Sequence, residues 1–521
     1  MNSNRHLDFL KFIIEAILLN FVLNVLANTI PLSTQINPII LLAIALLLTI
    51  TLYYLQVVRH PNGPTNWLIL AVIAFFLVIL FGSLILPTPP PICLTLTKVK
   101  NSISTGKPSL TEKDTPNEKD REQKIYDNNK DLNENNSYLL ALAIPAKTQP
   151  QAAKAMLAGV ADAQTKFNNQ LLPSLLKPTI PQKKLKIVVV DDRNNKDNFA
   201  KEVACEIATN PDWKNILGVI GHHSSGASKA ALDIYNKADL TMITPTSTST
   251  ELNQNSGKEV FFRTTVNNKA FAKILAHKII SLGKVRVFYE GNNDYAEDLK
   301  KNFIEEYNSF APNPVKEEEI IDIQNLNSAT INKLTIPPEV KAAVIFSSSG
   351  DDQKHEIAIK LIKKLKSTTP KLELFGGDSL YKGKTLSEGK TSIEGLKLVI
   401  PWHPVNSNGQ MISDYAKESA STWGGLTNWM TASSYDATQA FLAAIAQVEK
   451  KIQKVDKKSV LESMRTVDLK EEYTSGETLK FYNSEPQGRK PPIFVEVVQQ
   501  EKLPKILQCG VKFEVCFKPI Q

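Results

Sequence analysis

Two clusters of hydroxyl side chains each follow a short apolar segment of the sequence. The first is HHSSG at 222–226, the second is PTSTST at 245–250, and a helix is expected after each. The first N–H groups of a helix have no partner within it and lie at the positive end of its dipole, so they attract anions. Hydroxyl groups there can cap the helix or hold a ligand carboxylate. The two clusters are close enough in sequence to form one rim.

Other patterns that could do chemistry are incomplete. GGDSLYKGKT places five residues between its second and third glycines, whereas a phosphate loop needs four. GHHSSG places two residues before its first serine, whereas a hydrolase elbow needs one. We interpret His222 and His223 as structural, because no carboxylate is near them in sequence. No spacing predicts a zinc site. We therefore expect no enzyme, no metal and no cofactor.

The elements that must position the hydroxyl clusters are alternating strands and helices from residue 137 onward. YLLALAIP, KLKIVVVDD, ILGVIG and LTMITP are expected strands, with helices at 152–168 and 199–209. A second series has KVRVFYE, AAVIFSSS, LELFGGD and GLKLVIPW, with helices at 296–310 and 352–366. Strands this apolar are buried on both faces. We predict an α/β fold of two doubly wound parallel-sheet lobes with a hinge, and a ligand crevice at the carboxyl ends of the strands.

The N-terminal part of the chain is largely apolar. Segments 9–30, 38–58 and 67–86 are long enough for transmembrane helices, which need about 20 apolar residues each. The first segment carries charges near its start, so an interfacial helix is the alternative there. Arg5 precedes the first segment and Arg59 follows the second, which places the N-terminus in the cytoplasm. We predict a multi-pass cell-membrane protein whose C-terminal domain is extracytoplasmic.

Composition divides the chain into three regions. Residues 1–90 form the membrane region, 91–136 a polar linker expected to be disordered, and 137–521 the two-lobed domain. The net charge of +8 includes no Arg-rich or basic-aromatic run, so nucleic acid is not an expected partner. Cys509 and Cys516 are spaced as in a hairpin and can form a disulfide outside the membrane, with free thiols as the alternative.

An ordered set of motifs resembles a known family. GVIGHHSSGAS, DIY, MITPTSTSTEL and FFRT follow one another within 218–264. This set is similar to the leucine/isoleucine/valine-binding group of type I periplasmic binding proteins, the substrate-binding subunits of amino-acid ABC importers. The resemblance covers residue 137 to about the C-terminus. It implies a small molecule held between two lobes that close by a hinge, without covalent chemistry.

The resemblance also assigns ligand contacts in the first lobe. It implies that Ser225 and the loop of Thr246, Ser247 and Thr248 contact the carboxylate of the ligand. The hydroxyl clusters then look like two sides of an anion clamp at strand-to-helix junctions. Helix capping by Ser225 and Thr248 is the alternative.

In the second lobe, GNNDYAEDL and FGGDS carry the resemblance. They imply an aromatic ligand contact from Tyr295 and an acidic partner for a ligand ammonium from Asp378; a core tyrosine and a turn-forming aspartate are the alternatives. Two departures concern the pocket: Ser349 lies where the family has a tyrosine, and the first loop, IPAKTQPQ, carries Lys147. We expect a pocket more polar than one for branched aliphatic side chains, or one that has lost amino-acid binding.

These features together predict a membrane-tethered, extracytoplasmic binding protein for an amino acid or similar small zwitterion, feeding an ABC importer through its permease. One alternative is a sensor that signals through a separate partner, because this sequence has no kinase, cyclase or methyl-accepting region of its own. The other is an enzyme or a scaffold without a ligand, built on the same lobes; the lack of a catalytic set counts against the enzyme.

Overall fold

The computed structural model describes residues 93, 103–104, 121–171, 176, 183–253, 260–348, 352–451 and 453–520. The chain divides into two compact units, Met1–Pro87 and Thr88–Gln521, and the described residues belong to the second. The three predicted membrane segments and Ser349 lie outside the described residues.

The predicted fold class is wrong in one respect. In the part of the chain that the structure describes, no helix has both the length and the apolar character needed to cross a membrane. The longest described helix, α14 (Trp429–Lys450), carries polar residues such as Asp436 and Gln439 and is buried within the domain. The fold class is therefore corrected to a two-lobed α/β fold without transmembrane helices in the described residues.

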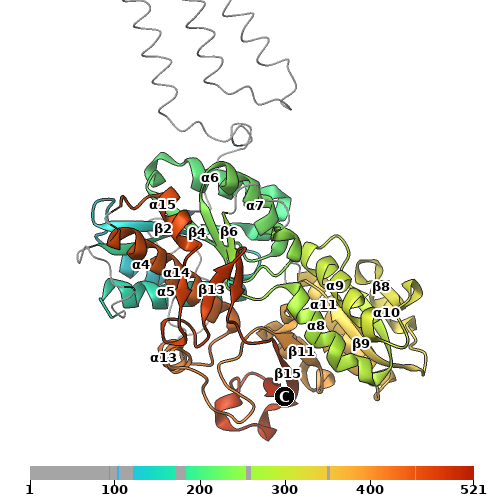
Figure 1. Cartoon of the computed structure of the whole chain (residues 1–521). Helices are drawn as coiled ribbons and strands as arrows, with labels where there is room; N and C mark the ends of the chain where they lie inside the picture. Colours follow the sequence, from blue (N-terminus) through green and yellow to red (C-terminus); the bar gives the residue numbers. More distant parts are fainter. Residues whose placement is uncertain are drawn as a thin grey trace, which may run out of the picture. The chain divides into compact units, whose positions relative to one another are not determined.

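The first lobe is built on a six-stranded sheet of order β1-β3-β2-β4-β5-β6 (Figure 1). Five strands run parallel, and β1 is antiparallel to β3. Every residue of β2 is buried, as expected of a central strand covered on both faces. The strands are β1 (Ile103–Ser104), β2 (Ser137–Ile144), β3 (Lys184–Asp191), β4 (Ile216–Ile220), β5 (Thr241–Thr244) and β6 (Phe261–Arg263).

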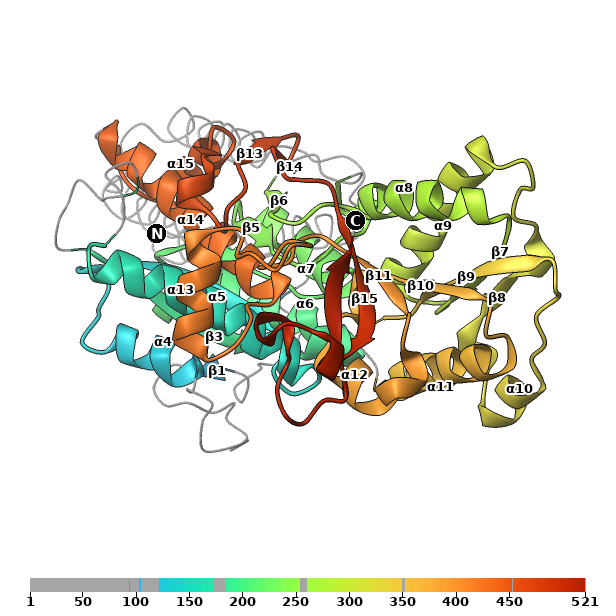
Figure 2. The same ribbon diagram turned by 90° about the horizontal axis from the view of Figure 1, so that it is seen from below.

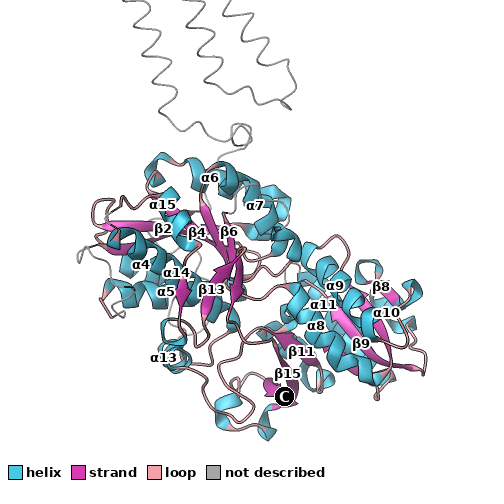
Figure 3. Ribbon diagram, in the orientation of Figure 1, coloured by secondary structure: helices cyan, strands magenta, loops and turns pink. Residues whose placement is uncertain are grey.

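Seven α-helices and a small three-stranded sheet complete the described part of this lobe (Figure 3). The helices are α4 (Arg121–Asn129), α5 (Pro150–Asn168), α6 (Phe199–Thr209), α7 (Ser225–Lys237), α13 (Asp414–Trp423), α14 and α15 (Lys457–Met464). The small sheet consists of β12 (Asp468–Leu469), β13 (Leu479–Tyr482) and β14 (Glu485–Gln487). Helices α5 and α14 approach closely at Gly159, where a Cβ atom would lie 2.1 Å from the carbonyl oxygen of Thr431.

The second lobe has a seven-stranded sheet of order β16-β15-β11-β10-β9-β7-β8. Helices α8 and α9 lie on one face of it, and α10 and α11 on the other (Figure 2). The strands are β7 (Lys284–Tyr289), β8 (Ile320–Asp322), β9 (Val340–Phe346), β10 (Glu373–Gly376), β11 (Lys397–Ile400), β15 (Ile493–Gln499) and β16 (Val515–Ile520). The helices are α8 (Asn268–Ile279), α9 (Asp294–Phe310), α10 (Ser328–Lys333), α11 (Asp352–Thr368) and α12 (Gly383–Gly389). Three stretches of chain connect the lobes, from β6 to α8, from β11 to α13 and from β14 to β15.

Most of the alternating elements predicted from the sequence are present. The four helices predicted with bounds correspond to α5, α6, α9 and α11 and differ from them by at most two residues at either end. The helix expected after the first hydroxyl cluster is α7, but the second cluster is followed by a short 3-10 helix, Thr250–Asn253, so the helix expected there was wrong. The eight predicted strands correspond to β2, β3, β4, β5, β7, β9, β10 and β11. Strands β15 and β16, which extend the second sheet in antiparallel fashion, were not predicted.

Part of the predicted disordered linker is folded. Helix α4 lies within 91–136 and buries Ile125. Its last residue, Asn129, donates from Nδ2 to the carbonyl oxygen of Ile187 at 2.7 Å, and its Oδ1 accepts from the N–H of Ile187 at 3.0 Å. The side-chain amide of Asn129 therefore pairs with both backbone polar groups of this residue of β3. A disulfide between Cys93 and Cys205 also fastens this region to α6. The described part of the linker is therefore ordered, while the boundaries of the three regions stay a prediction.

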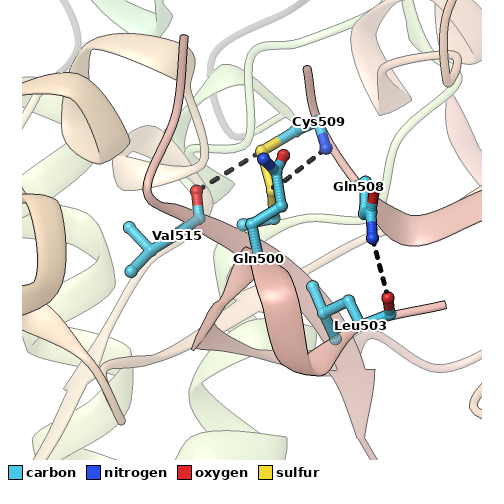
Figure 4. The surroundings of a disulfide bond; sticks show 6 residues. Gln500, Leu503, Gln508, Cys509 and Val515 are labelled. Atoms are coloured by element: carbon cyan, nitrogen blue, oxygen red, sulfur yellow. Dashed lines mark hydrogen bonds between the residues drawn. A yellow bond between two sulfur atoms is a disulfide. The ribbon is translucent and has the colours of Figure 1, made fainter. Parts of the chain in front are cut away.

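The second cysteine pair also forms a disulfide. Cys509 and Cys516 are joined beside β16, and the N–H of Cys509 lies 3.0 Å from the sulfur of Cys516 (Figure 4). Nearby, Gln508 donates from Nε2 to the carbonyl oxygen of Leu503 at 3.0 Å. Disulfides persist in oxidising compartments and are rare in reducing ones, so both pairs favour an oxidising location for the domain.

Candidate ligand-binding site

A cavity of about 700 Å³ is lined by residues of both lobes. Its walls come from the loops that follow β2, β3, β4 and β5 in the first lobe and β7, β9 and β10 in the second. These are the carboxyl ends of parallel strands, where the sequence predicted a crevice. Of the six predicted ligand contacts, four line the cavity and two do not. Those that line it are Ser225, Thr246, Tyr295 and Asp378; those that do not are Ser247 and Thr248.

The first hydroxyl cluster occupies the start of α7. The capping residue is Ser224, whose Oγ accepts from the N–H of Ala227 at 3.2 Å, so the capping alternative for Ser225 does not hold. Ser225 is the first residue of the helix, is 2 % exposed and accepts from the N–H of Ser249 at 3.2 Å. This hydrogen bond joins the two clusters. The positive end of the α7 dipole therefore faces the cavity beside a hydroxyl group that does not cap the helix.

The second hydroxyl cluster divides into one residue at the cavity and others that organise the loop. Thr246 Oγ1 donates to the carbonyl oxygen of His223 at 2.7 Å. Ser247 Oγ lies 2.7 Å from Ser228 Oγ, which ties the loop to α7. Thr248 Oγ1 is buried and has no hydrogen-bond partner among the described residues, and the following 3-10 helix begins only at Thr250. The clusters thus adjoin as predicted, but only Thr246 of this loop reaches the cavity.

The second lobe contributes a tyrosine and an aspartate that contact each other. Tyr295 OH donates to Asp378 Oδ1 at 2.7 Å. Asp378 is 4 % exposed, and burial raises the pKa of its carboxyl to about 6, although the hydrogen bond from Tyr295 opposes the rise. Burial also raises the pKa of Tyr295, which keeps its hydroxyl protonated as a donor. Gly377 leaves room for this pair, since a Cβ there would lie 2.2 Å from Tyr295 OH.

The two neighbouring histidines have different surroundings. His222 Nδ1 lies 2.6 Å from Asp192 Oδ2, and its Nε2 lies 3.0 Å from Tyr235 OH; the three side chains are buried. No carboxylate is near His222 in the sequence, but folding brings Asp192, which follows β3, into contact with it. His222 does not line the cavity. His223 does, and burial lowers its pKa to about 4, so it is neutral near pH 7.

Further residues of the cavity were not identified from the sequence. The 3-10 turn after β3 (Arg193–Asn198) adds Arg193, Asn194 and Asn195, and the segment that leads from β7 into α9 adds Glu290 and Asp294, among others. Their position in the sequence could have identified them, because each set follows an apolar strand of a parallel sheet, and ligands bind at the carboxyl ends of such strands. The side chains around the cavity are mostly polar or charged, with Trp429 and Met430 among the few apolar ones. This agrees with the expected polar pocket.

Comparisons with known proteins show what this arrangement is similar to. The model of the family described as "Receptor family ligand binding region" matches residues 177–484. No curated protein matches the chain in sequence. Among solved structures, a leucine binding protein from Thermotoga maritima is similar at 17% identity, with a TM-score of 0.56, over 69% of this chain and 95% of its own.

Two other solved structures carry bound ligands. An ABC transporter substrate-binding protein from Desulfitobacterium hafniense, in complex with Leu, is similar at 17% identity and a TM-score of 0.55, over 74% of this chain and 100% of its own. A solute binding protein of an ABC transporter from Rhodopseudomonas palustris, in complex with 3,4-dihydroxy benzoic acid, is similar at 14% identity and a TM-score of 0.57, over 74% and 96%. At these identities the likeness shows the fold.

Proposed function

Because the chain belongs to the family of receptor ligand binding regions, we propose that it is a two-lobed binding protein for an amino acid or a similar small zwitterion. The resemblance to leucine and branched-chain amino-acid binding proteins of the type I periplasmic fold is confirmed. The family and these structural neighbours are ligand-binding proteins.

The observation that supports the proposal is the opposite polarity of the two cavity walls. The first wall offers the start of α7 with the hydroxyls of Ser225 and Thr246, which suit a carboxylate. The second offers Asp378, held by Tyr295, which suits an ammonium once the carboxyl is ionised. An α-amino acid carries an ammonium and a carboxylate group on the same carbon atom. Contacts to both walls at once would stabilise the closed arrangement of the lobes.

The location and partner are part of the proposal. Two disulfides support an extracytoplasmic domain, since such bonds are rare in reducing compartments. The structural neighbours named as ABC transporter binding proteins support a partner of that kind, an importer permease to which the loaded protein delivers its ligand. A separate signalling partner is the alternative. The multi-pass membrane location stays a sequence prediction that depends on segments outside the described residues.

A thermal-shift screen of the full chain tests the proposal. The panel contains the twenty amino acids and benzoate, each near millimolar concentration. A ligand present at 100 times its Kd stabilises by about 2.7 kcal/mol, which raises the Tm by about 3 °C in a domain of about 385 residues. We expect at least one amino acid to do so. A Tm raised by benzoate alone would replace the zwitterion with an aromatic acid, and a flat screen would favour the scaffold.

A further inference from the structure

The loop after β3 is an unusual part of the first cavity wall. Three consecutive non-glycine residues, Arg193, Asn194 and Asn195, have φ values of 47°, 53° and 65°. Residues other than glycine rarely adopt this left-handed region, although asparagine does so more often than most, and three in a row persist only where neighbours enforce it. All three residues line the cavity. A constrained backbone therefore places three polar side chains at the cavity.

Two carboxylates behind the wall enforce this conformation. Asp191 Oδ1 accepts from the N–H of Arg193 at 3.1 Å, and Asp192 Oδ1 accepts from the N–H of Asn194 at 2.8 Å. Asp191 Oδ1 also accepts from the N–H of Lys147, in the loop after β2, at 3.4 Å. One carboxylate thus holds the backbones of two cationic residues, and both Lys147 and Arg193 line the cavity.

Several buried polar atoms of this wall make no hydrogen bond within the part of the chain that the structure describes. Among the described residues, no hydrogen-bond partner is found for Thr148 Oγ1, Arg193 Nε, Asn194 Oδ1 and Asn195 Oδ1. Trp429, which is 1 % exposed and also lines the cavity, has a buried Nε1 that likewise finds no hydrogen-bond partner among the described residues. Leaving such groups unpaired is unfavourable unless a ligand supplies partners. The N–H groups of Arg193 and Trp429 and the Thr148 hydroxyl can all donate to an anion.

The guanidinium of Arg193 is also held in place. Its Cζ lies 4.0 Å from the centre of the Phe199 ring, a cation–π contact that limits the motion of the side chain. An arginine fixed in this way loses less conformational freedom when it binds a carboxylate, for which its planar group is suited.

Charge is unequally divided between the walls. Among the described residues that line the cavity, the first lobe contributes Lys147 and Arg193 and no acid. The second lobe contributes three acids, but Asp294 pairs with Lys229 at 2.9 Å, and Glu290 accepts from the N–H of Ser348 at 2.7 Å. Asp192, behind the first wall, contacts His222. The first wall therefore favours an anionic ligand group beyond the one carboxylate that Ser225 and Thr246 accommodate.

We propose that the ligand is an amino acid with an acidic side chain, and that its second carboxylate binds Lys147 and Arg193. This inference rests on the proposed function and narrows it to a ligand class. A branched aliphatic side chain would leave the unpaired donors unsatisfied and would desolvate two cations without compensation.

Matched pairs of ligands test the inference by calorimetry on the full chain. Glutamate and glutamine, and aspartate and asparagine, have nearly the same shape and differ by one negative charge. We expect the acid of at least one pair to bind about tenfold or more tightly than its amide, as a charge-assisted hydrogen bond would give. Lys147→Gln and Arg193→Gln should each reduce this preference. Lys371→Gln, which removes an exposed lysine outside the cavity, should leave it unchanged.

The outcomes separate this inference from the function on which it rests. Amides, leucine or lysine binding as tightly as the acids would overturn the ligand class and leave an amino-acid binding protein. No binding by any amino acid would overturn both. Lys147 is exposed, so its variant should fold normally, and melting curves check that both variants do. If the preference for the acid over its amide survives both substitutions, Lys147 and Arg193 do not bind the second carboxylate.

Discussion

Replacing Asp378 with asparagine should weaken ligand binding and at the same time stabilise the empty protein. Asparagine keeps an oxygen that can accept from Tyr295 OH, so the loss is that of the charge. A hydrogen bond between charged groups is worth about 1.5–3 kcal/mol, and 1.4 kcal/mol corresponds to tenfold. The affinity for an amino acid at pH 7.5 should therefore fall roughly 10- to 100-fold.

The stabilising effect follows from the raised pKa of Asp378. Burial raises this pKa from 3.8 to about 6, so the carboxyl contributes its full stability below pH 3.8 and loses it as the pH rises through 6. The difference corresponds to at most about 3 kcal/mol at neutral pH. Asp378→Asn has no such loss. The ligand-free variant should be more stable than the wild type at pH 7.5, and this advantage should disappear near pH 4.

Scanning calorimetry without ligand and titration calorimetry with it measure the two effects. Asp468→Asn is a matched control, because this carboxyl is 58% exposed, pairs with Lys480 and lies outside the cavity. It should change neither quantity appreciably. Unchanged affinity in Asp378→Asn would refute the role of this residue as the ammonium partner. A lower Tm for the ligand-free variant would refute the argument from burial.

Three other predictions concern pH, the first hydroxyl cluster and the disulfides. Affinity for a zwitterion should fall up to tenfold per pH unit below about pH 6, because Asp378 then becomes neutral; titrations between pH 4.5 and 7.5 would show a flat profile if another group binds the ammonium. Ser225→Ala should weaken ligand binding about tenfold, whereas Ser224→Ala should lower the free energy of unfolding by about 1 kcal/mol, because it removes the helix cap. If the two variants lost affinity and stability equally, Ser225 would not be the ligand contact and Ser224 would not be the cap. Cys205→Ala opens a loop of 112 residues and should cost about 4–5 kcal/mol, against about 2 kcal/mol for Cys509→Ala, by urea unfolding under oxidising conditions; the reverse order would contradict the chain-entropy argument.

The fold was predictable because its strands are apolar on both faces. Runs such as KLKIVVVDD leave few alternatives to a central parallel strand, and the loops after such strands gather at one edge. Strands β15 and β16 were missed because the strand–helix alternation ends before them. Helix α4 was missed because a single buried apolar residue, Ile125, and side-chain amides dock it, and neither produces a hydrophobic pattern.

The candidate site was predictable only in part. The sequence placed both hydroxyl clusters together, but it could not show that Ser247 and Thr248 are turned away from the cavity, because side-chain direction in a loop follows no fixed period. The contact between His222 and Asp192 joins residues 30 positions apart that follow β4 and β3, two strands separated in the sheet by β2. Arg193 was overlooked although it directly follows β3, and its left-handed backbone depends on hydrogen bonds that only the folded chain provides.

The central claim is that the cavity binds a zwitterion by both of its charges. Titration calorimetry of the full chain with the best amino acid from the screen tests this directly, alongside its analogue without the α-amino group and its analogue without the α-carboxyl group. If both charges are bound, each analogue should bind at least tenfold more weakly than the amino acid, because each loses one charge-assisted contact. An analogue without the amino group that binds as tightly as the amino acid would contradict it.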